Sequence, residues 1–207
     1  MTTVLKQLAE NNVEVMRITV DQYHRMMETG ILLEGSPYEL IDGFIVRKDR
    51  SASGEDPMMV GHEHIWAVKM LARLNPELIQ LGCHMQTQSP IILTDLSEPE
   101  PDGVILLGDE DRYKLRKAVS SDIVSIFEVS SSSLDYDRTT KLAMYADSGI
   151  SQYMIVNLPD RVLEVYTLPQ LGKGRYRQVD TLLPGAKLQF FGAENQKLEI
   201  AVRSLLP

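Results

Sequence analysis

The chain has 207 residues, of which 43% are hydrophobic and 24% are charged, and its 29 acidic and 21 basic side chains give a formal net charge of −8. These proportions are typical of a folded protein and argue against wholesale disorder. The acidic balance excludes a general nucleic-acid coat, because neutralising many phosphates requires a basic surface. No run of about 18 apolar residues is present, so we expect no membrane-spanning helix. The single cysteine, Cys83, excludes an intrachain disulfide.

The length fits one domain, and we expect residues 1–207 to form a single domain. The first twenty residues mix polar and apolar side chains, which is unlike a secretory signal peptide, so a cytoplasmic protein is the simplest interpretation. Residues 161–207 carry seven basic and four acidic side chains, a net of +3, which leaves −11 on residues 1–160. Two linker-like stretches, residues 47–57 and 95–101, do not separate self-sufficient halves.

The first half of the chain predicts two helices and a hairpin. Residues 19–30 predict a helix that ends at a glycine. Residues 38–48 predict a hairpin, because Asp42-Gly43 is a type I′ turn signal between two arms with apolar residues. Residues 62–74 predict a second helix. Its expected apolar face consists of Ile65, Val68, Leu71 and Ala72, flanked by Trp66 and Met70.

Short runs rich in Ile, Val and Leu dominate the second half and predict strands, the most continuous of which are typical of central strands. Residues 138–148 predict a helix with Asp137 as its N-cap, so residues 123–158 form a strand–helix–strand crossover in a mixed sheet. The five expected strands are residues 90–94, 103–107, 123–129, 153–158 and 162–168. One more edge strand is expected over residues 173–182, with Lys173, Arg175 and Arg177 on one side.

Three carboxylates lie in or beside these apolar segments. Glu128 lies inside its strand, where a charge is costly unless it is paired, protonated or bound to a metal. Asp102 directly precedes residues 103–107, and Glu39 lies in the hairpin. If the three converge, their oxygens favour Mg²⁺ or Mn²⁺ over zinc, whereas the alternative is three separate strand-end charges or salt bridges. Strict alternation puts Glu128 on the face of Val124, Ile126 and Ser130.

Other features are weaker signals. Lys141 lies one turn into the helix after the Glu128 strand, where it either pairs with the carboxylates or is solvated. The serines at 130–133 predict a polar turn, since no Gly-x-Ser-x-Gly frame surrounds them. His62 and His64 stand two apart and are a poor metal pair, although His64 alone is able to reach a site. The sequence lacks both common glycine-rich nucleotide-binding motifs.

Five segments, in this order, resemble the Uma2 family of endonucleases, which is abundant in cyanobacteria. They are Tyr-Glu-Leu-Ile-Asp-Gly (38–43), Glu-Pro-Asp (100–102), Phe-Glu-Val-Ser (127–130), Asp-Arg-Thr-Thr-Lys-Leu-Ala-Met-Tyr-Ala-Asp-Ser-Gly-Ile (137–150) and Gln-Tyr-Met-Ile-Val (152–156). The family belongs to the PD-(D/E)XK, restriction-endonuclease-like superfamily. The resemblance therefore implies an α/β fold, a mixed β-sheet flanked by helices with an N-terminal helix and β-hairpin.

The resemblance also implies a function, the hydrolysis of DNA phosphodiester bonds with Mg²⁺ or Mn²⁺ as cofactor, and a homodimer. The superfamily lysine normally stands two residues after the strand glutamate, where this chain has Ser130, and the family commonly carries it on the next helix, which matches Lys141. The implied catalytic residues are Glu39, Asp102, Glu128 and Lys141. The implied metal ligands are Asp102, Glu128, Glu39 and the Val129 carbonyl. The expected DNA phosphate contacts are Lys173, Arg175 and Arg177.

Two alternatives stay open at this point. The first is a relative with the same fold but no nuclease activity, acting as a binding or regulatory module with no metal affinity. The second is a metal-dependent hydrolase of another phosphoester, such as RNA or a nucleotide, which would use the same ligands. The sequence does not separate either of them from a DNA endonuclease.

Overall fold

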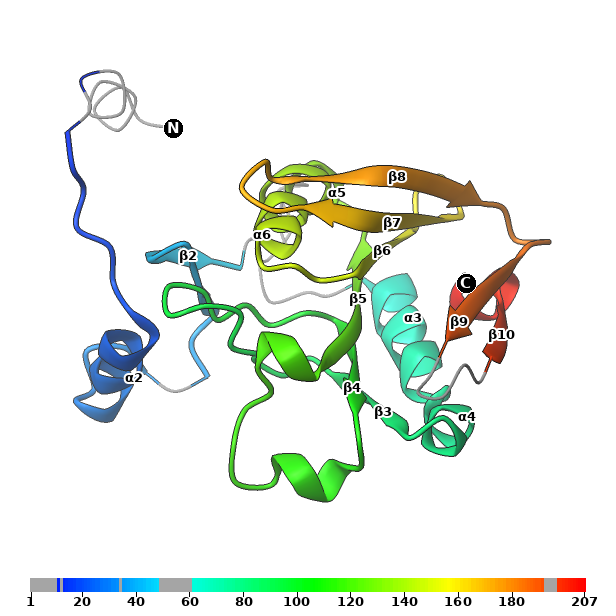
Figure 1. Cartoon of the computed structure of the whole chain (residues 1–207), viewed down its shortest axis with the longest axis horizontal. Helices are drawn as coiled ribbons and strands as arrows, with labels where there is room; N and C mark the ends of the chain where they lie inside the picture. The colour runs from blue at the N-terminus through cyan, green and yellow to red at the C-terminus, as the bar shows by residue number, and fades with distance from the viewer. Residues whose placement is uncertain (1–10, 12, 34, 49–60, 192–196) are drawn as a thin grey trace.

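The computed structural model describes residues 11, 13–33, 35–48, 61–191 and 197–207. A six-stranded mixed sheet forms its centre (Figure 1). Strands β5 (Ile123–Ser130) and β6 (Gln152–Asn157) pair in parallel, and the other neighbours in the sheet pair antiparallel. The order across the sheet is β3 (Cys83–Thr87), β4 (Gly103–Leu107), β5, β6, β7 (Val162–Gln170) and β8 (Arg175–Leu182).

Two hairpins and several helices surround this sheet. The hairpins are β1 (Tyr38–Ile41) with β2 (Phe44–Arg47), and β9 (Lys187–Phe191) with β10 (Lys197–Ala201). The helices are α2 (Val20–Glu28), α3 (His62–Ala72), α4 (Asn75–Gln80), α5 (Leu134–Tyr136) and α6 (Leu142–Asp147), with a π-helical turn at Asp137–Lys141 and 3₁₀ turns at Glu110–Tyr113, Ser120–Asp122 and Val202–Leu205. None of the helices in the described ranges is long and apolar enough to cross a membrane.

Each face of the sheet buries its own apolar cluster. On one face, α3, α4 and the C-terminal segment cover Phe127 and Val129 of β5. On the other face, α6 covers Ile126 together with Tyr153 of β6. Figure 1 shows α3 and the β9–β10 hairpin on one side of β5 and α6 on the other. The predicted crossover is confirmed, because β5 and β6 pair in parallel. Both strands are covered on both faces, which explains why their sequences are nearly continuous apolar runs.

The two N-terminal predictions are confirmed. Helix α2 begins after Thr19, whose hydroxyl accepts the Gln22 N–H at 3.2 Å while the Gln22 side chain accepts the Thr19 N–H at 2.9 Å. The hairpin turn has φ of 49° at Asp42 and 77° at Gly43, as a type I′ turn requires. A Cβ at Gly43 would lie 2.4 Å from the Cβ of Arg17, so this position needs glycine for space as well as for φ.

Helix α3 buries Val68 and Leu71 as predicted, but the rest of its core face differs from the prediction. Ile65 is 40% exposed and Ala72 is also exposed, whereas Ala67 is fully buried beside Val68 and Leu71. The small Ala67 side chain packs in the cluster with Phe127, and the bulky Ile65 is left outside. The helix is therefore rotated so that His64, one turn before Ala67 and Val68, also faces the sheet.

Residues 90–94 are not a strand, contrary to the prediction. Ile91 and Leu93 are buried, but Ile92 and Thr94 form isolated bridges, to Val119 and Ser97. The apolar side chains of this run are therefore buried, although its backbone does not pair continuously with another strand. The linker-like residues 95–101 are held against the hairpin, because the backbone of Glu98 pairs with that of Leu40 in β1. Residues 49–57 of the other predicted linker lie outside the described residues. Among the helices and strands of the described residues, α4, β3, β9 and β10 were not predicted.

A β-bulge changes the predicted face of Val124. Ile105 pairs with Ser125 but Leu106 pairs with Ile123, so Val124 is an extra residue between them. Val124 packs on the α3 side, whereas Ile126 belongs to the cluster on the α6 side, which is also the side of Glu128. The crossover helix also begins earlier than predicted, at Leu134, so Asp137 lies inside it and is not its N-cap.

Candidate active site

Two strand ends bring the predicted carboxylates together. Asp102 directly precedes β4 and Glu128 lies near the end of β5, and these ends are neighbours because Gly103 pairs with Phe127. The Asp102 Oδ2 accepts the Val129 N–H at 2.9 Å. Both carboxylates are buried, Asp102 with 8% and Glu128 with 4% of the residue exposed. The site therefore lies where two neighbouring inner strands of the sheet, β4 and β5, meet at their ends.

Lys141 reaches this site from the crossover helix. Its Nζ lies 2.9 Å from Glu128 Oε1 and 3.5 Å from Glu39 Oε2, and its side chain is 8% exposed. Tyr145, one turn further along, donates its hydroxyl to the same Glu128 oxygen at 2.7 Å. The π-helical turn at Asp137–Lys141 rotates the chain relative to a regular helix, and such turns are frequent at functional sites.

Glu39 is delivered by the hairpin. Leu40 and Glu98 exchange backbone hydrogen bonds of 3.3 and 2.8 Å, which dock β1 against the chain that leads to Asp102. The Oε2 of Glu39 also accepts the Glu100 N–H at 3.2 Å. The structure therefore places Glu39 opposite Glu128, with the Lys141 ammonium group in contact with both.

His64 is a site residue that the sequence indicated only as a single histidine able to reach a site. Its Nε2 lies 3.0 Å from Asp102 Oδ2, and its Nδ1 is buried with no hydrogen-bond partner among the described residues. The signal for it was present, since His64 shares the buried face of α3 with Ala67, Val68 and Leu71 at helical spacing. A polar side chain on a buried helix face requires a polar partner, and Asp102 supplies it.

A cluster of hydrogen bonds surrounds Asp137, which the sequence suggested only as a helix cap. The hydroxyls of Ser130 and Ser133 donate to its Oδ2 at 2.6 and 2.7 Å, so the serine run is a turn with two specific contacts. Tyr136, next in the chain, has a buried hydroxyl without a partner in the part of the chain that the structure describes. Burial and the nearby Glu39 charge raise the pKa of Tyr136 to about 12. No sequence pattern distinguished Tyr136 or Tyr145 from tyrosines of the core.

The two central carboxylates have opposite pKa shifts. Burial raises the pKa of Glu128 from 4.5 to about 8, with further increases from Asp137 and Asp102, although the Lys141 charge opposes them. Burial also acts on Asp102, but the His64 contact and the Val129 N–H outweigh it, so the pKa of Asp102 is lowered. Pairs of carboxylates whose surroundings shift their pKa values in opposite directions are typical of functional sites.

Lys141 stays protonated in this environment. Burial alone would lower its pKa, but the charges of Glu128 and Glu39 outweigh burial and hold the pKa of Lys141 well above its usual value. A permanently charged ammonium group is unsuited to accept a proton. The geometry therefore favours a role in orienting a water or stabilising negative charge.

The carboxylates leave oxygens for a cation. The hydrogen bonds described above fall on Oδ2 of Asp102 and Oε1 of Glu128, one oxygen of each group. No three His, Cys, Asp or Glu side chains within the described ranges are grouped as a complete metal-binding cluster. Any divalent cation bound here would therefore take part of its ligands from water, which is usual for Mg²⁺.

The three predicted DNA contacts lie elsewhere. Arg175 and Arg177 are exposed on β8, which is an edge strand as predicted, and Lys173 lies in the turn before it. Strands β6 and β7 lie between β5 and β8, so β8 is about 14 Å from β5 at ordinary strand spacing. The structure therefore does not bring these side chains into the carboxylate site.

A comparison with protein families gives a match over residues 20–202 to the Uma2 model, described as "Putative restriction endonuclease". The chain belongs to the Uma2 family. A solved structure, of "a putative nuclease belonging to DUF820" from Anabaena variabilis, is similar to this Uma2 protein at 15% identity and a TM-score of 0.60, covering 91% of this chain and 97% of that one. This likeness confirms the predicted mixed sheet flanked by helices. No curated protein matches the chain.

Proposed function

We propose that this Uma2 protein is a Mg²⁺-dependent endonuclease that hydrolyses phosphodiester bonds of DNA and acts as a cytoplasmic homodimer. The description of the family and the name of the similar solved protein both support nuclease activity. The observation that carries the proposal is the buried Lys141–Glu128 pair beside Asp102. Burying such charges costs stability, so a cluster of them at the ends of inner strands indicates a functional site.

The donor set fits Mg²⁺ and equally Mn²⁺. Asp102 and Glu128 would hold the ion through carboxylate oxygens, with the Val129 carbonyl as a further ligand and Glu39 as an acceptor for a second ion or for a coordinated water. All of these donors are oxygens, which both ions prefer. When bound, the ion lowers the pKa of a coordinated water and neutralises charge on the phosphate.

The residues of the chain have separate tasks in this proposal. Lys141 orients the attacking water and stabilises the negative charge that develops on the phosphate, because it remains protonated. Glu39 and Tyr145 fix the positions of Lys141 and Glu128. His64 and the Val129 N–H hold the Asp102 carboxylate in one orientation. The protein thus contributes mainly preorganisation, the arrangement of charges before the reaction starts.

Two measurements on the Asp102→Asn variant test the proposal. We expect the wild-type protein to bind Mn²⁺ in a calorimetric titration and to nick supercoiled DNA with Mg²⁺, and Asp102→Asn to lose both while its thermal unfolding is unchanged. Glu77→Gln, which alters an exposed carboxylate on α4, is the matched control and keeps both activities. Cleavage by Asp102→Asn at the wild-type rate would overturn the proposal.

The same assay separates the alternatives. Absence of both metal binding and cleavage in the wild-type protein would favour a binding or regulatory module with the nuclease fold. Cleavage of RNA or a nucleotide, with no cleavage of duplex or single-stranded DNA, would favour a hydrolase of another phosphoester. The homodimer is tested by light scattering, where a monomer at micromolar concentration would contradict it.

A further inference from the structure

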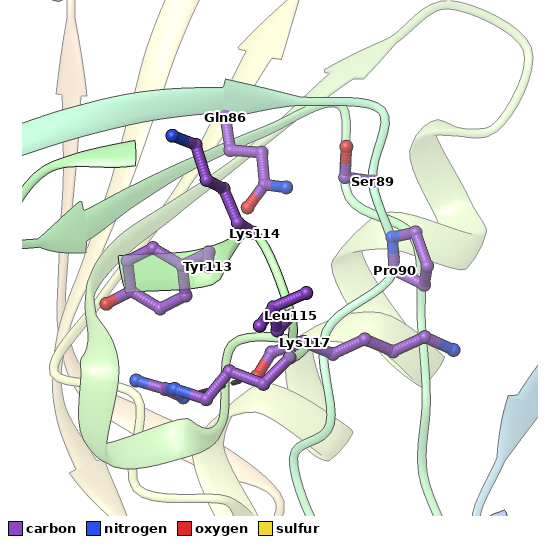
Figure 2. Close-up of a pocket in the computed structure, with 8 residues that line it drawn as sticks. Gln86, Ser89, Pro90, Tyr113, Lys114, Leu115 and Lys117 are labelled. Carbon is purple, nitrogen blue, oxygen red and sulfur yellow. Dashed lines mark hydrogen bonds between the residues drawn. The ribbon is translucent and has the colours of Figure 1, made fainter. Parts of the chain in front are cut away.

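A second polar feature lies in the loop that joins β4 to β5, outside the carboxylate site. This loop, residues 108–122, closes a hollow of about 440 Å³ against the end of β3 (Figure 2). Three cations line the hollow, and none of its lining residues is acidic. Figure 2 shows Lys114 beside Gln86 on one side of the hollow and Lys117 on the other, with Leu115 between them. The lining cations are Lys114, Arg116 and Lys117.

Buried carboxylates hold two of these cations in place. The buried Asp122 binds Arg116 with contacts of 2.6 and 3.0 Å and also binds Arg112 at 3.1 Å, so two guanidinium groups share one carboxylate. The buried Glu98 binds Lys117 at 2.5 Å. These acids do not line the hollow, and their contacts fix Arg116 and Lys117 in position before a ligand binds.

The loop also exposes apolar surface between its charges. Leu115 is fully exposed and stands between Lys114 and Arg116. The Arg116 guanidinium lies 4.8 Å from the centroid of the Tyr113 ring. A single exposed leucine is ordinary, but an apolar side chain flanked by cations matches a nucleic-acid strand, in which phosphates alternate with sugars and bases.

The hollow is close to the proposed active site along the chain. Gln88 donates its N–H to the Asp102 carbonyl at 3.3 Å, and the next residue, Ser89, lines the hollow. Glu98, the partner of Lys117, is four residues before Asp102, a span of at most about 14 Å. A nucleic-acid strand carries one charge per about 3.4 Å of helix axis, so a few nucleotides cover a distance of this order.

We propose that this hollow binds the phosphate backbone of the DNA strand that enters the carboxylate site. Lys114, Arg116 and Lys117 contact phosphates, and Leu115 packs against sugars or bases. The choice of DNA as the partner rests on the proposed function. The hollow is distinct from the predicted contacts on β8, because β3 and β8 are opposite edges of the sheet.

Charge reversal at Lys114 tests the hollow without disturbing the fold, since Lys114 is exposed and pairs with the exposed Asp111. Binding of a labelled DNA of about 20 nucleotides, single-stranded or duplex, is measured by fluorescence anisotropy in EDTA over a range of salt concentrations. We expect Lys114→Glu to weaken binding about tenfold near 0.1 M salt, and to lower the slope of log affinity against log salt by about 1. Leu115→Gln should weaken single-stranded binding about threefold.

Lys69→Glu is the matched control, because Lys69 is exposed on α3, which packs on the other face of the sheet. We expect it to change affinity less than about twofold. Equal losses in Lys114→Glu and Lys69→Glu, or no DNA binding by the wild-type protein in EDTA, would overturn the hollow as a DNA site. Lys173→Glu in the same series measures the contribution of the β8 side.

The cleavage assay keeps the two proposals distinguishable. If the Lys114 effect is found but the wild-type protein does not cleave DNA with Mg²⁺, the proposed function fails and the hollow stands as a DNA-binding site. If cleavage is found and Lys114→Glu binds and cleaves as the control does, the proposed function stands and the hollow fails.

Discussion

The two faces of β5 bury different kinds of side chain. Toward α3, Phe127 and Val129 pack in an apolar cluster. Toward α6, Ile126 is followed by Glu128 and Ser130, both buried in polar contacts. Burial of a large apolar side chain stabilises a fold by about 1.5–3 kcal/mol, whereas a buried ion pair often contributes nothing net. On β5, therefore, the face toward α3 has Phe127 and Val129 in an apolar cluster, whereas the face toward α6 combines part of a second apolar cluster with the proposed chemistry.

The largest expected effect separates chemistry from stability on the polar face. Glu128→Gln keeps the shape of the side chain but replaces its ionisable carboxyl group with an amide, and Glu39 remains as a partner for Lys141. We expect Mg²⁺-dependent DNA cleavage to fall at least about 1,000-fold, with the circular dichroism spectrum unchanged. Single-turnover cleavage measures the effect, and a loss smaller than about tenfold would show that this face does not carry the reaction.

The converse change is made on the apolar face. Phe127→Ala removes a fully buried ring, and we expect the free energy of unfolding to fall by about 3–5 kcal/mol. Urea unfolding gives this value, and Phe44→Ala, at a side chain 43% exposed, is the control with a change below about 0.5 kcal/mol. Cleavage per folded molecule should change little in Phe127→Ala. A large loss of cleavage at full folding would mean that the two faces are not separable.

The polar face should also make stability depend on pH. Because the pKa of Glu128 is about 8 in the folded protein and 4.5 ordinarily, the folded state holds a proton between these pH values that the unfolded chain has released. The free energy of unfolding should therefore fall as the pH rises from about 5 to 8, at up to about 1.4 kcal/mol per pH unit. Urea unfolding at four pH values measures it. The Glu128→Gln variant should have a flatter profile, and identical profiles would contradict the shift.

The smallest effect concerns the hairpin that brings Glu39 to the site. Gly43→Ala puts a side chain at φ of 77° and against Arg17, which costs about 1–2 kcal/mol for the backbone alone. Thermal unfolding measures this loss of stability. A Mn²⁺ titration should show weaker metal binding than in the wild-type protein, because Glu39 moves. The control is Gly185→Ala, a position with no close neighbours, which should be near neutral. Equal effects in both variants would show that the hairpin does not depend on this turn.

Local patterns in the sequence were sufficient for elements whose partners are adjacent. The Asp42-Gly43 turn and the capping residue Thr19 act within a few residues, so their effect is readable from the chain alone. The same patterns failed for residues 90–94 and for Ile65, where apolar composition does not reveal which segment provides the partner. Strand β3 has few β-branched or aromatic residues, and its place in the sheet depends on pairing with β4.

The sequence by itself determined the central strands, the crossover and the presence of carboxylates that an apolar strand does not tolerate alone. Only the tertiary structure decided which side chain contacts each carboxylate, Lys141 for Glu128 and His64 for Asp102, and that Arg175 lies on the edge strand β8, away from both. The reason is physical, since backbone periodicity acts over a few residues. The convergence of Glu39, Asp102 and Lys141 depends instead on sheet order and on the docking of a hairpin, which many distant contacts establish together.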